Sequence, residues 1–289
     1  MANEADIPAL IEPSDLAARL GEPGLVVLDV RSAGYGGGLA AFDAAHIPGS
    51  IHTDYVADAW RMTRGTAAGL LPEADHLAAL FGRLGIRPDD HVVVVPAGMS
   101  SGDFSVAARI FWTFRAAGHR RLSMLDGGFE AWSTLGLPLA EGSVEPAEPT
   151  SYPVRPDPSV RALLPEVEAA VGTRSAALVD SRGPKSFAGE EKSGQVARAG
   201  RLPGSLNVEG AAAYDPGANR LRPRAELEGL FSPVPAGPAI PFCNTGQAAA
   251  TDWFVMSEVL KRPGVKLYDG SMSEWAGDPS RPVETGSGT

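Results

Sequence analysis

The one cysteine of the 289-residue chain, Cys243, stands where a thiol can act as a nucleophile. An apolar run at residues 238–242 precedes it, and a helical pattern at residues 247–260 follows it. Between a strand and a helix, free backbone N–H groups and the positive end of the helix dipole would face the sulfur. Both favour the thiolate over the thiol. This context indicates covalent catalysis by Cys243, whereas an isolated cysteine would more simply be a small buried hydrophobe.

Two other cysteine chemistries are disfavoured by residue positions. A Cys–His dyad would need a distant partner, because every histidine lies in the first half of the chain (His46, His52, His76, His91 and His119). A phosphatase of the Cys-x5-Arg type needs an arginine at position 249 to bind phosphate, and the chain has Ala249 there. A binding module that has lost its activity remains an alternative.

The composition is that of an ordinary globular protein, with 44% hydrophobic and 21% charged residues. One cysteine excludes an intramolecular disulfide and any multi-cysteine metal site. A net charge of −10 argues against nucleic-acid binding, and no apolar run is long enough for a membrane span. The acidic N-terminus has no signal-peptide pattern, so we expect a cytoplasmic protein and leave open a processed periplasmic form.

The sequence contains an internal duplication. Three segments recur in the same order: 26–31 as 177–182, 46–51 as 201–206, and 125–132 as 268–275. A repeat of this length indicates duplicated domains. Between the copies, prolines 146, 149, 153, 156 and 158 disfavour helix. We therefore predict a non-catalytic N-terminal domain at residues 1–145, a proline-rich linker at 146–160 and a catalytic C-terminal domain at 161–289.

Short apolar runs alternate with helical patterns in both copies. The first predicts strands at residues 25–30, 91–95 and 122–125 and a helix at 104–117, and the second predicts strands at 176–180, 239–242 and 265–268. Such alternation predicts the α/β class: two tandem domains, each a parallel sheet with helices on both faces. The reactive group of such a sheet lies at the carboxyl ends of its strands, where Cys243 is expected.

These motifs together resemble the rhodanese family, specifically its two-domain sulfurtransferases that act on thiosulfate or 3-mercaptopyruvate. The resemblance spans nearly the whole chain and is carried by four segments of the second copy: 180–182, 201–205, 243–248 and 269–275. In that family the C-terminal domain carries the cysteine and the N-terminal domain has lost it. The first copy has residues 96–103 at the corresponding place, and they contain no cysteine.

The resemblance implies that the Cys243 thiolate takes the sulfane sulfur of a donor as a persulfide and passes it to cyanide or a thiol. No metal or organic cofactor is implied. Backbone N–H groups of the following loop would hold the anionic donor or the persulfide. The predicted substrate-binding residues in this loop are Asn244, Thr245, Gly246, Gln247, Ala248 and Ala249.

Positive charge for the donor must come from outside this loop, because residues 236–260 contain no Lys or Arg. Here the sequence departs from the family, whose thiosulfate enzymes carry basic residues directly after the cysteine. Residues 182–224 hold eight cations against four acids, and Lys185 and Arg182 follow a strand end on the expected rim. We predict that Lys185 contacts the donor and leave open whether Arg182 is structural. The compact dianion thiosulfate is the favoured donor, with 3-mercaptopyruvate as the alternative.

Overall fold

The computed structural model describes residues 7–144 and 148–286, which form two compact units. Unit 1 is built from the residues up to Trp60, from Pro72–Asp157 and from Asp215–Leu221. Unit 2 is built from Arg61–Leu71, from Pro158–Tyr214 and from the residues after Leu221. The two halves of the sequence therefore exchange one short segment each, which a division at a single linker does not provide for.

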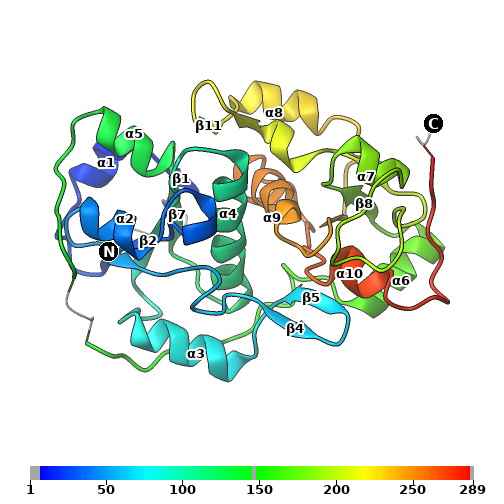
Figure 1. Ribbon diagram of the computed structural model, residues 1–289, viewed down its shortest axis with the longest axis horizontal. Coiled ribbons are helices and arrows are strands. Elements are labelled where there is room, and N and C mark those ends of the chain that lie inside the picture. Colours follow the sequence, from blue (N-terminus) through cyan, green and yellow to red (C-terminus); the bar gives the residue numbers. More distant parts are fainter. Residues whose placement is uncertain (1–6, 145–147, 287–289) are drawn as a thin grey trace. The chain divides into compact units, whose positions relative to one another are not determined.

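Unit 1 contains a parallel sheet of five strands within the described residues (Figure 1). Its order is β1 (Leu10–Ile11), β7 (Leu122–Leu125), β6 (His91–Val95), β2 (Leu25–Asp29) and β3 (Ile51–His52). The central strand β6 is a run of valines that are all buried, as expected for a strand covered on both faces. The strands predicted at residues 25–30, 91–95 and 122–125 are confirmed.

Helices cover both faces of this sheet. Ile11, Val93 and Val95 pack on one face with Leu16 of one helix and Trp132 of another. On the other face Trp60, Phe81 and Phe114 form an aromatic cluster. The helices of unit 1 are α1 (Pro13–Ala17), η2 (Ala33–Tyr35), α2 (Leu39–Ala44), α3 (Ala74–Arg83), α4 (Ser101–Ala116) and α5 (Gly128–Thr134).

Unit 2 repeats this plan with shorter strands. Its described parallel sheet has the order β12 (Ala239–Phe242), β8 (Ala177–Asp180) and β9 (Leu206–Asn207). Beyond β12 the sheet continues only as isolated parallel bridges, from Ala239 to Val265 and from Leu267 to Arg161. The strand predicted at residues 265–268 is therefore reduced to two bridge residues, although it keeps the place that β7 has in unit 1.

The helices of unit 2 again lie on both faces of the sheet. The core places Val167 of α6 and Trp275 of α10 against Ile240 and Leu178. The helix predicted after the cysteine is present, but only its first part is α-helix and the rest is a π-helix. The elements are α6 (Leu164–Thr173), α7 (Pro184–Ala188), η3 (Gly210–Ala213), α8 (Arg224–Leu230), α9 (Ala248–Trp253), η4 (Phe254–Val259) and α10 (Ser271–Trp275).

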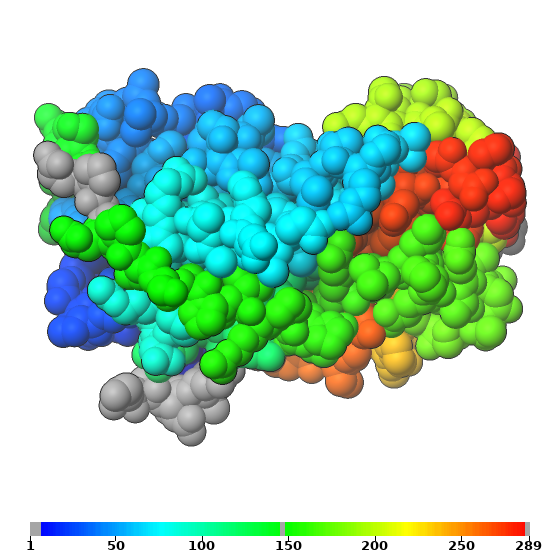
Figure 2. All heavy atoms as spheres, turned by 90° about the horizontal axis from the view of Figure 1, so that it is seen from below, coloured from blue at the N-terminus to red at the C-terminus, as the bar shows by residue number. Residues whose placement is uncertain are grey.

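Part of the predicted linker is described. Residues 146 and 147 lie outside the described residues, and 148–157 have no regular secondary structure. This segment is nevertheless bonded to unit 1: the Thr150 amide donates to Gly82 O and the Arg155 amide to Ala117 O, at 2.9 Å each. Figure 2 shows it (green) running beside α3 (cyan). Backbone pairing therefore holds this proline-rich stretch against the surface of unit 1.

The exchanged segments are hairpins. Unit 2 receives β4 (Met62–Arg64) and β5 (Ala67–Leu70), which are antiparallel. In the second half of the sequence β10 (Tyr214–Asp215) pairs with β11 (Arg220–Leu221), and the segment Asp215–Leu221 belongs to unit 1. Each hairpin binds the aspartate of a repeated Asp-Gly motif: the Leu71 amide donates to Asp269 at 2.6 Å, and Arg220 pairs with Asp126 at 3.3 Å.

Candidate active site

Cys243 directly follows β12 and is 3% exposed. Phe242, the last residue of β12, pairs in register with Asp180, the last residue of β8. The Ser181 amide donates to Phe242 O at 2.8 Å, so Ser181 and Cys243 leave the sheet side by side. The cysteine thus lies at the carboxyl end of a central parallel strand, where residues of several elements converge.

The backbone of Cys243 is fixed on both sides by the start of α10. The amide of Cys243 donates to Ser271 Oγ at 3.1 Å, and this hydroxyl donates to Tyr268 O at 2.8 Å. The carbonyl of Cys243 accepts from the Met272 amide at 3.0 Å. Ser271 holds this position with φ 50, in the left-handed region that a residue with a side chain rarely adopts. Two hydrogen bonds, one of them to a side-chain hydroxyl, therefore fix the main chain of Cys243.

The loop that follows the cysteine exposes backbone donors. Within the described part of the chain, the amides of Asn244, Thr245 and Gly246 donate to no protein group. Gly246 has φ 76, which turns the chain into α9. The Oδ1 atom of Asn244 is buried without a partner. Unpaired buried polar groups are rare in native structures, and several at one place indicate a ligand that completes them.

The hairpin β4–β5 packs directly on this loop within unit 2. Gly69 has φ 87, and a Cβ built there would lie 2.1 Å from Thr245 O. The Ala68 amide donates to Ser273 Oγ at 3.1 Å, and the same hydroxyl donates to Ala68 O at 3.1 Å. No side chain fits at Gly69 without displacing the loop, so the hairpin helps to set the loop's position. The sequence pattern does not indicate this contribution, because the hairpin comes from the other half of the chain.

A buried carboxyl group lies beside the site. Asp252 of α9 is fully buried, and burial raises its pKa well above the ordinary value, although the neighbouring Ser181 hydroxyl opposes that rise. The negative charge of Asp180 raises the pKa of Asp252 further. These effects favour the protonated, uncharged carboxyl. A neutral Asp252 adds no negative charge beside the loop that follows Cys243.

The two cations predicted for the donor are in different settings. Arg182 is 5% exposed, and its guanidinium binds Asp180 at 2.9 and 2.6 Å and Gly200 O at 2.9 Å. Unit 1 repeats this pair as Arg31 with Asp29. Lys185 is exposed on α7, which follows the carboxyl end of β8, and its ammonium has no protein partner among the described residues.

The remaining cations of the segment 182–224 are engaged. They bind backbone carbonyls or carboxylates: Lys192 to Val196, Arg198 to Ala276, Arg201 to Gly286, Arg220 to Asp126, Arg222 to Glu226, and Arg224 to Glu228. The local excess of positive charge is thus mostly used within the fold. Lys185 is the cation of this segment that the described structure leaves available.

Other kinds of site find no support in the described residues. No group of three or more His, Cys, Asp or Glu side chains is arranged to hold a metal ion there. None of the helices in residues 7–144 and 148–286 has the length and apolar character of a membrane span.

Comparison with known proteins identifies the family to which this fold belongs. The family model for the rhodanese-like domain matches residues 12–135 and 163–278. The chain therefore belongs to the rhodanese-like family, and it carries two copies of the domain.

Individual relatives give the class of activity. The chain is 34% identical to a thiosulfate sulfurtransferase of Pseudomonas aeruginosa, over 97% of this chain and 98% of that protein. It is 33% identical to a probable 3-mercaptopyruvate sulfurtransferase of the same organism, over 96% and 98%. The crystal structure of SseA from Escherichia coli, a 3-mercaptopyruvate enzyme, superposes with a TM-score of 0.76, 27% identity and coverage of 91% and 98%. The chain is a sulfurtransferase of the two-domain kind.

Proposed function

We propose that the protein transfers sulfane sulfur from thiosulfate to cyanide or a thiol through a persulfide on Cys243. The proposal rests on one observation: at the end of β12, hydrogen bonds fix the backbone of Cys243, and the next three amides have no protein acceptor among the described residues. A thiolate at that point faces donors that can bind an anion, and the carboxyl ends of parallel strands are where such a site is expected.

The reaction balances without a redox partner. The Cys243 thiolate attacks the outer sulfur of thiosulfate, an Sγ–S bond forms, and the S–S bond of the donor breaks with its electron pair leaving on sulfite. An acceptor thiolate or cyanide then attacks the terminal sulfur of the persulfide. The Sγ–S bond breaks, its electron pair returns to Cys243, and the product is a new persulfide or thiocyanate.

The loop amides of Asn244 to Ala249 would stabilise the negative charge of the donor and then of the persulfide. Lys185 is the cation proposed to attract and hold the dianion, since it is exposed at the correct end of the sheet and unpaired among the described residues. Arg182 is proposed to position the end of β8, because its guanidinium is already occupied.

The alternative donor is 3-mercaptopyruvate. Relatives named for each donor match this chain almost equally, at 34% and 33% identity, so similarity does not separate the two. The absence of Lys and Arg from residues 236–260 favours a modest thiosulfate activity. Thiosulfate remains our choice because a compact dianion can be held by convergent amides and one cation, without a pocket for a keto acid.

Two measurements test the proposal. First, kcat/KM for each donor with cyanide as the common acceptor should favour thiosulfate, and a preference for 3-mercaptopyruvate above about tenfold would reverse the donor choice. Second, Cys243→Ser should lower transfer by at least about a thousandfold while the melting temperature stays near that of the wild type. Substantial transfer by the serine variant would refute the mechanism. If the wild-type protein is folded and stable but transfers sulfur from neither donor, a binding module is favoured.

A further inference from the structure

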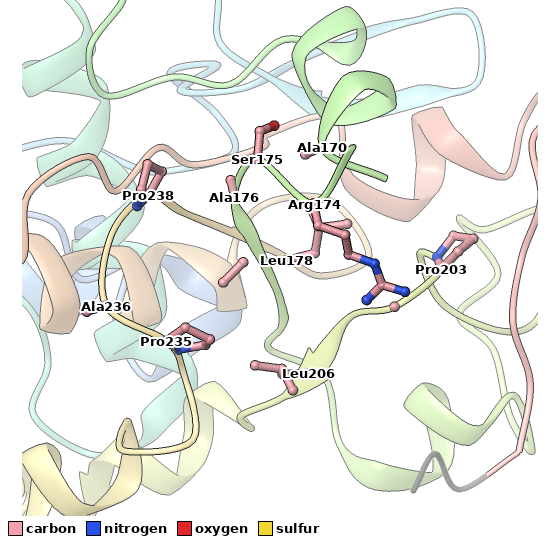
Figure 3. A pocket seen from close by; sticks show the side chains of 12 residues that line it. Ala170, Arg174, Ser175, Ala176, Leu178, Pro203, Leu206, Pro235, Ala236 and Pro238 are labelled. Carbon is pink, nitrogen blue, oxygen red and sulfur yellow. The ribbon is translucent and has the colours of Figure 1, made fainter. Parts of the chain in front are cut away.

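A hollow of about 280 Å³ lies at the opposite end of the sheet of unit 2 from Cys243 (Figure 3). It is formed where the strands begin: Ala177 and Leu178 of β8, Leu206 of β9, and Pro238 just before β12. Cys243 follows the other end of β12. Strands of four residues separate the two ends by roughly 13 Å, so a molecule in this hollow would not touch the sulfur.

Most side chains that line the hollow are apolar, and Arg174 and Ser175 add polar groups. Pro203, Pro235 and Pro238 line it together with small or branched aliphatic side chains, and Figure 3 shows these groups around a common space. The carbonyl of Pro235 also accepts a hydrogen bond from Arg262, which fixes that side of the hollow. A preformed apolar wall loses little conformational entropy when a ligand binds.

One charged side chain enters the hollow. Arg174 extends toward the Pro203–Gly204 turn (Figure 3). A Cβ at Gly204 would lie 2.4 Å from Nη1 of Arg174, so the guanidinium packs against a glycine that leaves space for it. Among the described residues, the guanidinium has no hydrogen-bond or ion-pair partner. Arg174 is an exposed residue, so its five N–H donors face solvent at the edge of the hollow and have no protein acceptor among the described residues.

The backbone of Arg174 supports a role for its side chain. The residue ends α6 with φ 58 and ψ 29, the left-handed conformation that glycine adopts most easily at this position of a helix. A glycine would close the helix with less strain, and it would leave the hollow without a cation.

The neighbouring charges do not neutralise the guanidinium. Glu284 accepts from the Gly204 amide at 3.0 Å and lies 3.7 Å from Arg201. The turn therefore carries two guanidiniums and one carboxylate. In an adjoining hollow that shares Ala176 and Pro238, Lys266 is paired with Glu166 at 2.8 Å. The balance of charge around the hollow favours an anion.

We propose that this hollow is a second ligand site, for a small free carboxylic acid with a compact apolar body. The carboxylate binds the fork of Arg174, and the apolar body lies against Leu178, Leu206 and the prolines. A planar carboxylate matches the fork of a guanidinium in a bidentate pair. The volume of the hollow suits a molecule of about ten non-hydrogen atoms.

Calorimetric titration with benzoate, and with benzamide as its uncharged counterpart, tests this site. Wild type should bind benzoate with a Kd on the order of 1 mM and benzamide at least about tenfold more weakly. Arg174→Gln should weaken benzoate binding by at least about tenfold. Lys261→Gln is the matched control, because Lys261 also has a left-handed backbone (φ 57) in unit 2 and does not line the hollow.

A second variant separates loss of the site from loss of the fold. Arg174→Gly removes the fork and relieves the strained φ, so it should melt at or above the wild-type temperature and still fail to bind benzoate. Benzoate binding by Cys243→Ser should equal that of the wild type. The site would be refuted if benzoate binding survived in either Arg174 variant, or if wild type showed no saturable binding at about tenfold the expected Kd.

Discussion

The two units contain the same strand–loop–helix turn, and only one of them carries a cysteine. Equivalent hydrogen bonds set the correspondence: the Phe129 amide donates to Pro96 O at 2.9 Å in unit 1, as the Met272 amide donates to Cys243 O at 3.0 Å in unit 2. Pro96 therefore occupies the place of Cys243. From these residues the two loops run without insertions to the first residues of α4 and α9.

The loop of unit 1 binds a carboxyl group of its own. Asp103 accepts the Met99 amide at 3.0 Å and the Ser100 amide at 3.1 Å, and Ser100 caps α4 in return. The residue equivalent to Asp103 in unit 2 is Ala250, which has no such group. The comparison indicates that this turn is a generic anion cradle. Asp103 occupies it in unit 1, and we propose that an external anion occupies it in unit 2.

The residue that lies opposite the cysteine position also differs between the two units. Proline has no N–H, and unit 1 has Gly128 opposite Pro96, with φ 61. Cysteine has an N–H, and unit 2 has Ser271 at the matching place, with φ 50 and its hydroxyl on that amide. A residue with a side chain in the left-handed region costs roughly 1–2 kcal/mol. The serine is therefore retained at a cost in stability, which supports a functional role for its hydroxyl.

Ala250→Asp should have the largest effect on activity, because it gives unit 2 a carboxylate at the position that Asp103 has in unit 1. The new carboxylate would accept loop amides and repel an anionic donor, so kcat/KM for thiosulfate should fall by at least about a hundredfold. Ala250→Asn is the uncharged control and should retain more activity. Wild-type activity in the Ala250→Asp variant would show that the loop amides do not bind the donor.

Ser271→Gly should imitate the equivalent position of unit 1. It removes the hydrogen bond to the Cys243 amide but relieves the left-handed backbone, so stability should change little while kcat/KM falls by about tenfold. Ser271→Ala loses the bond and keeps the strain, and it should be less stable than the glycine variant by about 1 kcal/mol. If Ser271→Gly is as active as the wild type, the Ser271 hydroxyl does not contribute to sulfur transfer.

Lys185 has no cationic counterpart in unit 1, where the residue at the same distance from the strand end is Gly34. Lys185→Ala should raise KM for thiosulfate by up to about tenfold with little change in kcat, since an exposed cation acts mainly on binding. Added salt should reduce wild-type activity in the same way and affect the variant less. The idea fails if the variant keeps the wild-type KM and salt dependence.

The units should also differ in their response to acid, because all five histidines lie in the first half of the chain. Burial lowers the pKa of His91 and of His119 to about 4, from 6.5. Between these values the unfolded chain binds more protons than the folded one, so unit 1 loses stability as pH falls from 6.5 toward 4, by at most about 1.4 kcal/mol per pH unit for each histidine. Hydrogen exchange should show unit 1 opening first, and His119→Gln should reduce the slope. An unchanged slope would contradict the assignment.

The local pattern of apolar residues was enough to predict the central strands of both parallel sheets. Short runs of buried apolar residues predicted the central strands, and the position of Cys243 after such a run predicted its place at the carboxyl edge of the sheet. The sequence identifies the repeated Asp-Gly segment as part of the domain repeat and of the family resemblance, and assigns no role to Ser271. Its function at Ser271 depends on a single hydrogen bond to the Cys243 amide, which no spacing rule reveals.

The remaining features depend on contacts between distant parts of the sequence. The hairpin at Arg61–Leu71 joins unit 2, although its sequence lies in the first half of the chain. The eight cations of residues 182–224 suggested a basic surface, but within the described structure carbonyl and carboxylate partners from many elements bind all of them except Lys185. The pairs of Arg222 with Glu226 and of Arg224 with Glu228 have helical i,i+4 spacing, but the partners of Arg198, Arg201 and Arg220 are distant in sequence and depend on the tertiary fold.

The most direct test of the open cradle is mass spectrometry of the protein after thiosulfate treatment. Wild type should gain one sulfur atom, located on the peptide that contains Cys243, because the unpaired amides stabilise the persulfide. Ala250→Asp should gain little or none under the same conditions. The account is contradicted if wild type carries no added sulfur on Cys243, or if Ala250→Asp forms the persulfide as readily as the wild type.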